Sequence, residues 1–154
     1  MSRPNFIGIN HLKFAAADIL KTKNFYCSIM NFGYLADYDH RMPSGELFAV
    51  MLQLEHTTSS GATTPILVEI RHNEAQAKAQ QGWDLVTIGV RTKDDLDACK
   101  SWFEANGVEC SRVFTGPKGW VLAALDPDGK IVRVYCDEEH EWTTEFDEDD
   151  FWLR

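Results

Sequence analysis

The sequence of 154 residues lacks long apolar runs and is short of basic residues, with 15 Lys and Arg against 24 Asp and Glu and a formal net charge of −9. The apolar runs fall far short of the roughly 20 residues that cross a bilayer, so we expect no transmembrane helix. Binding to nucleic acid or to an anionic membrane depends on positive surface. We therefore expect neither as a partner.

The four cysteines form no CxxC pair or other metal-ligand spacing, and the first residues lack a basic stretch followed by a long apolar run. Reduced thiols without a signal-like segment favour a cytoplasmic protein. The sequence also lacks a GxGxxG loop, a Walker loop and a GxSxG motif. No dinucleotide, nucleotide or serine-hydrolase chemistry is therefore indicated.

The negative charge is concentrated in the C-terminal tail, residues 137–154, which has nine acids and one base, whereas residues 1–136 carry a net charge of only −1. Four aromatic residues interrupt the acids of the tail: Trp142, Phe146, Phe151 and Trp152. Purely solvated acidic tails contain few aromatics. One hypothesis is that these rings dock on the body of the protein or on a second subunit, and the alternative is a disordered tail.

Hydrophobic periodicity predicts the order strand, helix, strand, strand, strand in each half of the chain. Expected strands are residues 7–14, 34–40, 47–54 and 66–71 in the first half, and 85–90, 108–113, 120–125 and 131–136 in the second. The first helix begins after Asp18 and ends near Asn31, and the second begins at a capping box of Thr92 and Asp95 and ends at Gly107. We divide the chain into a first βαβββ module (1–72), a connector (73–82), a second βαβββ module (83–136) and the tail.

Two motifs give this repeat a family resemblance over residues 6 to 137. The first strand has the form apolar-x-His-apolar around His11, and Asp126-Pro127-Asp128-Gly129 forms the turn before the last strand. This pattern resembles the vicinal oxygen chelate superfamily, which includes glyoxalase, bleomycin-resistance proteins, fosfomycin-resistance enzymes and extradiol dioxygenases. The resemblance implies an α+β fold in which two βαβββ modules form a curved mixed sheet with a cleft, and it implies a homodimer.

Family members with a metal take ligands from the first and last strand of each module. The equivalent positions here are His11, Glu69, Thr87 and Arg133. Thr is a poor ligand and a guanidinium has no lone pair to donate, so we expect no cofactor. Arg133 could take the place of the cation with its guanidinium directed at Glu69, and a divalent metal on His11 and Glu69 remains an alternative.

Strand alternation places apolar side chains on one face of each sheet, and polar side chains on the face that holds the ligand in the family. On this reading the catalytic candidates are His11, Glu69 and Arg133, and the substrate-binding candidates are Lys13, Arg71, Thr87, Arg91, Trp120 and Tyr135. The competing interpretation is that Lys13, Arg71 and Arg91 reach solvent at strand ends while Glu69 and Arg133 only neutralise each other. We expect His40 and His140 to be solvated surface residues.

The leading hypothesis is a metal-independent enzyme of this superfamily that binds a small anionic, aromatic or enolisable metabolite and catalyses isomerisation, cyclisation or lyase-type chemistry. His11 would move a proton, Arg133 would stabilise the oxyanion, and Glu69 would orient Arg133 or act as a second base. One alternative is a non-catalytic binding protein like the bleomycin-resistance members. The other is a metal-dependent lyase or dioxygenase.

Overall fold

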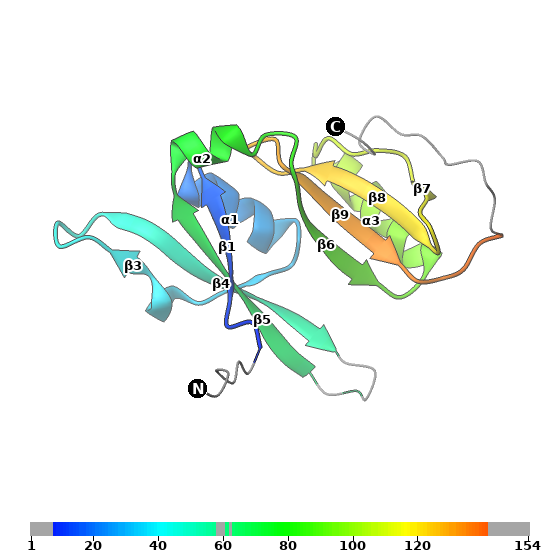
Figure 1. Ribbon diagram of the computed structural model, residues 1–154, viewed down its shortest axis with the longest axis horizontal. Helices are drawn as coiled ribbons and strands as arrows, with labels where there is room; N and C mark the ends of the chain where they lie inside the picture. Colours follow the sequence, from blue (N-terminus) through cyan, green and yellow to red (C-terminus); the bar gives the residue numbers. More distant parts are fainter. Residues whose placement is uncertain (1–7, 58–60, 62, 142–154) are drawn as a thin grey trace, which may run out of the picture. The chain divides into compact units, whose positions relative to one another are not determined.

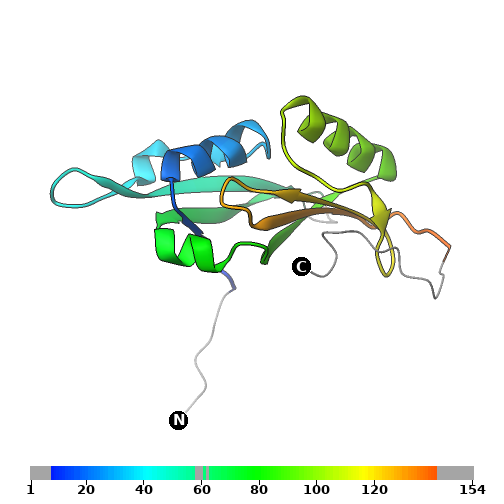
Figure 2. The same ribbon diagram turned by 90° about the horizontal axis from the view of Figure 1, so that it is seen from above.

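The computed structural model describes residues 8–57, 61 and 63–141. The chain divides into two compact units, Met1–Glu74 and Ala75–Arg154. In each unit one helix covers one face of a small sheet, α1 in the first and α3 in the second (Figures 1 and 2). The predicted α+β class with two βαβββ modules is confirmed.

The first unit contains β1 (Leu12–Ala16), α1 (Ile19–Ser28), β2 (Gly33–Tyr34), the 3-10 helix η1 (Ala36–Tyr38), β3 (His40–Arg41), β4 (Leu47–Thr57) and β5 (Thr63–His72). Its sheet has the order β1-β5-β4-β2, and β3 also pairs with β4. The first and last strands, β1 and β5, are parallel neighbours, so residues from the two ends of the module lie side by side.

The second unit repeats this topology after the short helix α2 (Glu74–Ala79). It contains β6 (Asp84–Val90), α3 (Lys93–Ala105), β7 (Phe114–Thr115), β8 (Trp120–Leu125) and β9 (Ile131–Cys136). The sheet order is β6-β9-β8-β7, and β6 runs parallel to β9. No helix among the described residues is both long and apolar enough to cross a membrane.

The helix boundaries follow from the capping residues found in the sequence. The Asp18 side chain accepts a hydrogen bond from Lys21 N at 3.0 Å, and Asn31 after α1 adopts a left-handed φ of 60°. Thr92 and Asp95 form the predicted capping box of α3, and Gly107 follows this helix with φ of 67°. These predicted boundaries are confirmed.

The core of the first unit is an aromatic cluster between α1 and the sheet. The ring of Tyr26 lies 5.5 Å from Phe14, 5.3 Å from Phe25 and 5.4 Å from Phe32. Phe14 of β1 therefore faces α1. Since side chains alternate along a strand, the neighbouring Lys13 faces away from the helix, as do Glu69 and Arg71, which lie beside β1 in register.

Two predicted strands are wrong. Residues 34–40 divide into β2, η1 and β3, because Tyr38 N bonds back to Leu35 O and the Tyr34 hydroxyl donates to Asp39, closing a turn. Residues 108–113 contain only an isolated bridge at Cys110. There the Ser111 hydroxyl accepts the Ala123 N–H, so a side chain replaces a carbonyl of the strand ladder.

The tightest glycine site in the second unit gives a test of the packing around β8. A Cβ at Gly119 would lie 1.9 Å from the backbone oxygen of Cys136, whereas a Cβ at Gly89 would meet nothing within 4 Å. We expect Gly119→Ala to lower the free energy of unfolding by about 1–3 kcal/mol because the backbone must move. Urea denaturation measures this, with Gly89→Ala as the control, and equal stability of the two variants would contradict the packing described here.

Candidate functional site

A buried carboxylate, that of Glu69, lies at the centre of a polar cluster on the face of the first sheet that points away from α1. Glu69 is in the middle of β5, opposite Lys13 of β1, and Arg71 follows two residues later on the same face. Only 1% of Glu69 is exposed. A carboxylate so buried is costly unless cations and hydrogen bonds compensate it.

Two cations provide this compensation, one at each oxygen of the carboxylate. Arg71 Nε donates to Oε1 at 2.7 Å, and Lys13 Nζ lies 3.2 Å from Oε2. Burial disfavours the charged form of Glu69, but the hydrogen bonds from Arg71 and Lys13 outweigh it and hold the pKa of Glu69 below its ordinary value of 4.5. Glu69 is therefore an ionised acid at neutral pH.

Two imidazoles complete the anion-site cluster, the name we use for His11, Lys13, His40, Glu69 and Arg71. His11 Nε2 lies 3.3 Å from Glu69 Oε2, and His40 Nδ1 lies 4.0 Å from Oε1. With both imidazoles neutral, one acid faces two cations, so the net charge of the cluster is +1. The side chains of Lys13 and Arg71 are 52% and 45% exposed, which leaves this excess positive charge accessible to a ligand.

The orientation of His11 is set by its neighbour in the chain. His11 Nδ1 lies 2.8 Å from Asn10 Oδ1, and because an amide oxygen can only accept, Nδ1 carries the hydrogen. In the neutral ring Nε2 then has a lone pair, whereas in the imidazolium it carries a second N–H directed at Glu69 Oε2, 3.3 Å away. Among the described residues, this buried nitrogen has no hydrogen-bond partner. It is therefore one of the atoms of the cluster that can gain and lose a proton, besides the imidazole of His40 and the carboxylate of Glu69.

The side chain of His40 is 40% exposed, as a surface residue would be, but it also lies at the edge of the cluster, which the sequence did not predict. The register between β3 and β4 shifts between His40 and Arg41, so simple alternation fails at this edge. The ring of Phe48 lies 5.7 Å from the ring of His40, and the guanidinium of Arg71 also lies 5.7 Å from the Phe48 ring. An apolar ring thus borders the charged groups.

Arg133, the second catalytic cation predicted, forms an ion pair with Asp84 in the second unit. Its guanidinium also lies 6.0 Å from the ring of Phe114. Asp84 was missed because alternation puts it on the opposite face, whereas a register shift between Asp84 and Val86 changes its direction. The predicted pairing of Arg133 with Glu69 stays a prediction.

The substrate-binding candidates of the second unit lie in different places. Thr87 is exposed and lies opposite Arg133 in register, and the Tyr135 hydroxyl accepts the Gly119 N–H at 3.0 Å. Trp120 instead lies beside α3, where the Lys93 ammonium is 5.2 Å from its ring centroid. Arg91 lines a hollow together with residues of α3, and Thr87 is not among the residues that line this hollow.

The pairing registers also compare the two modules directly. In the first module Lys13 is paired with Glu69, and in the second module Thr87 is paired with Arg133. If Glu69 and Arg133 are equivalent, Lys13 is therefore equivalent to Thr87. From the sequence and the family resemblance, His11 and Thr87 are expected at equivalent positions instead. His11 directly precedes β1, on the same side of the chain as Lys13, and its imidazole still reaches Glu69.

The donor set does not fit the divalent metal that the resemblance implies. Both oxygens of Glu69 are engaged by cations, and the equivalent positions of the second unit are a threonine and an arginine that has an acidic partner. Within residues 8–57, 61 and 63–141, no three His, Cys, Asp or Glu side chains form a metal-binding group. A metal on His11 and Glu69 would first have to displace Lys13 and Arg71, which repel it.

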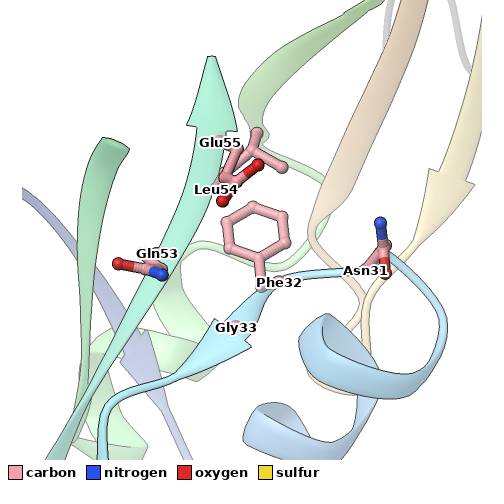
Figure 3. Close-up of a pocket in the computed structure, with 6 residues that line it drawn as sticks. All are labelled: Asn31, Phe32, Gly33, Gln53, Leu54 and Glu55. Atoms are coloured by element: carbon pink, nitrogen blue, oxygen red, sulfur yellow. The ribbon is translucent and has the colours of Figure 1, made fainter. Parts of the chain in front are cut away.

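A hollow of about 310 Å³ in the first unit is separate from the cluster. Its lining residues come from the turn after α1, from the start of β2 and from β4: Asn31, Phe32, Gly33, Gln53, Leu54 and Glu55 (Figure 3). Figure 3 shows the ring of Phe32 among these residues. This lining includes no basic side chain and none of the predicted site residues, so we do not assign it a role in anion binding.

The lowered pKa of Glu69 predicts a specific acid sensitivity. A depressed pKa stabilises the folded state above pH 4.5, and this contribution is lost as the pH falls through the lowered value. We expect Glu69→Gln to cost about 1–3 kcal/mol at pH 7, because Lys13 and Arg71 lose their counter-charge. The variant should lose less further stability than the parent below pH 4.5.

Thermal unfolding at pH 7 and at a series of values below 4.5 measures both effects. Glu46→Gln, which changes an exposed acid in the turn before β4, is the control and should stay within about 0.5 kcal/mol of the parent. If Glu69→Gln and Glu46→Gln behaved alike at every pH, the buried ion cluster would not contribute to folding.

Comparisons with known proteins agree with this fold. The model of the Glyoxalase/Bleomycin resistance protein/Dioxygenase superfamily matches residues 8–134. Similar solved structures include the fosfomycin resistance protein FosX from Listeria monocytogenes, with 15% identity, a TM-score of 0.61 and coverage of 86% of this chain and 94% of FosX. Lactoylglutathione lyase from Agrobacterium tumefaciens is also 15% identical, with a TM-score of 0.60 and coverage of 85% and 94%.

A glyoxalase/bleomycin resistance/dioxygenase domain from Frankia sp. EAN1pec is 16% identical, with a TM-score of 0.60 and coverage of 86% of this chain and 98% of that domain. No curated protein matches the chain. Identities this low establish the fold and not the chemistry. The family match extends over most of the sequence and both modules, and the chain therefore belongs to the glyoxalase/bleomycin resistance protein/dioxygenase superfamily.

Proposed function

We propose that the protein is a metal-independent enzyme that binds a small organic anion at the anion-site cluster and moves a proton with His11. The observation that supports this most is the excess of positive charge around one buried carboxylate, with Lys13 and Arg71 both close to half exposed. An anionic ligand would be attracted to the two cations. The ring of Phe48 beside Arg71 and His40 would favour an aromatic or partly apolar ligand.

In the proposed chemistry, the Oε2 atom of Glu69 exchanges one partner for another when the ligand binds. Lys13 and His11 converge on Oε2, at 3.2 and 3.3 Å. A bound anion would draw the Lys13 ammonium toward itself and leave Oε2 to His11. His11 Nε2 would then take a proton from the ligand, and Glu69 would stabilise the resulting imidazolium. Lys13 and Arg71 would stabilise the enolate or phenolate oxygen.

Isomerisation, cyclisation and lyase-type reactions can begin with such a proton transfer. We propose that the enzyme catalyses a reaction of one of these classes. Arg133 keeps its proposed role as an oxyanion-stabilising residue, and its ion pair with Asp84 would help to orient its guanidinium. A homodimer, which the resemblance implies, and a cytoplasmic location, which the cysteines and the first residues favour, remain part of the proposal.

Anion binding is tested with benzoate, which has a carboxylate and a ring but no acidic C–H. We expect benzoate to shift the backbone amide NMR signals of Lys13, Glu69 and Arg71. Lys13→Met and Arg71→Met should each weaken the affinity about tenfold or more, because each removes a charge-assisted contact. Lys21→Met on α1 alters an exposed cation on the opposite side of the sheet and should leave the affinity unchanged. Equal effects of all three variants would indicate nonspecific attraction.

Proton transfer is tested with phenylpyruvate, an aromatic anion whose methylene protons exchange through an enolate. In D2O we expect the protein to accelerate deuterium exchange at this position, as followed by proton NMR. His11→Ala should reduce the acceleration about a hundredfold or more while benzoate still binds. If phenylpyruvate bound without any acceleration, the protein would be a sequestering protein like the bleomycin-resistance members. Loss of exchange on addition of EDTA would support the metal-dependent alternative.

A further inference from the structure

The first residues of the C-terminal tail fold back onto the second unit. Glu138 Oε2 accepts a hydrogen bond from Lys93 N, the first residue of α3, at 2.8 Å. His140 Nε2 lies 2.8 Å from Gly116 O, and its ring lies 5.4 Å from the ring of Trp120 at an interplanar angle of 65°. We call these residues the tail clasp: Lys93, Gly116, Trp120, Glu138 and His140.

Each contact of the clasp has a recognisable chemical basis. The N–H of Lys93 is one of the first amides of α3, which have no hydrogen-bond acceptor within the helix. The carboxylate of Glu138 accepts this hydrogen bond, and its negative charge lies near the positive end of the helix dipole. The ammonium of Lys93 lies 5.2 Å from the centroid of Trp120, a cation–π distance. Trp120 is therefore in contact with both Lys93 and His140.

His140 can satisfy its two contacts only when it is protonated. Its Nδ1 lies 2.9 Å from Glu141 O, and its Nε2 lies 2.8 Å from Gly116 O. Both partners are carbonyl oxygens, which accept and cannot donate, whereas a neutral imidazole has a single N–H. Two simultaneous hydrogen bonds therefore require the imidazolium.

We propose that the surface formed by Gly116, Trp120 and the N-terminus of α3 binds the chain's own acidic tail, and that protonation of His140 controls how firmly the tail is held. The occupant is the segment 137–141, whose contacts are described above. The four tail aromatics of the docking hypothesis, Trp142, Phe146, Phe151 and Trp152, lie outside the described residues.

The charges around the clasp are consistent with a cationic His140. The segment itself carries Asp137, Glu138, Glu139 and Glu141. The turn that supplies Gly116 O contains Lys118, and Tyr135 of β9 accepts the N–H of Gly119 in that turn. From α3, Lys93 faces Trp120 and is itself paired with Asp97 at 2.7 Å. The acids of the segment favour the imidazolium, and Lys93 and Lys118 oppose it.

The direction of the pH dependence follows from the hydrogen bonds. The carbonyls of Glu141 and Gly116 raise the pKa of His140 above its ordinary value of 6.5. A raised pKa means that the clasp is fully stabilised below pH 6.5 and loses this stabilisation as the pH rises through the pKa of the folded state. The tail should therefore be held at mildly acidic pH and released at higher pH.

The amide of Lys93 provides a local reporter in the full-length protein. Since its hydrogen-bond acceptor in the structure is Glu138 Oε2, its hydrogen exchange rate follows the clasp. After correction for the intrinsic pH dependence of exchange, we expect the protection of the Lys93 amide to fall as the pH rises through the pKa of His140. The total fall should be up to about tenfold for each unit by which that pKa is raised. The imidazole titration of His140, followed by NMR, should show the same midpoint.

Two variants separate the clasp from general pH effects. His140→Gln cannot become charged and should abolish the pH step in Lys93 protection without altering the core of the unit. His72→Gln, which changes an exposed histidine at the end of β5, should leave the step unchanged. The proposal would be overturned by a His140 titration at its ordinary value, by the same pH step in His140→Gln, or by Lys93 protection that does not change with pH.

Discussion

The cluster around Glu69 depends on one electrostatic constraint: a carboxylate with 1% exposure must keep its charge inside a β-sheet. Removing an ion from water costs several kcal/mol, and only close partners offset this cost. Lys13 and Arg71 provide these partners, and each extends from a strand position that faces the same side as Glu69. Because both cations reach toward solvent as well, the interaction that stabilises the carboxylate also leaves positive charge on the sheet surface.

In the proposed function, the superfamily fold presents a ligand site without the usual set of metal ligands. Lys13 and Arg71 occupy the two carboxylate oxygens, where a metal would otherwise coordinate. In the second unit the equivalent strand position carries Arg133, whose guanidinium is paired with Asp84. The proposed chemistry therefore assigns to fixed ammonium and guanidinium groups the charge stabilisation that a Lewis acid would supply.

The sequence predicted the features that follow from regular backbone. The repeat of two modules, the capping residues Asp18 and Thr92, and the side of the sheet that carries Lys13, Glu69 and Arg71 all follow from period and alternation. Two residues of the site that the sequence did not predict lie where the backbone is irregular. His40 joins the cluster and Asp84 turns toward Arg133 at register shifts, which a single sequence does not reveal. The contacts of His140 cannot be predicted from the sequence, because its partners are backbone carbonyl groups, which carry no sequence signal.

In the proposed function, the positive charge of the cluster comes from the side chains of Lys13 and Arg71 and not from a metal ion. The most direct measurement is elemental analysis of protein purified without added metal or chelator, combined with benzoate binding before and after dialysis against EDTA. We expect far less than one equivalent of any transition metal per chain and unchanged affinity after EDTA. Stoichiometric zinc, nickel, manganese or iron, with benzoate affinity lost on its removal, would contradict the account.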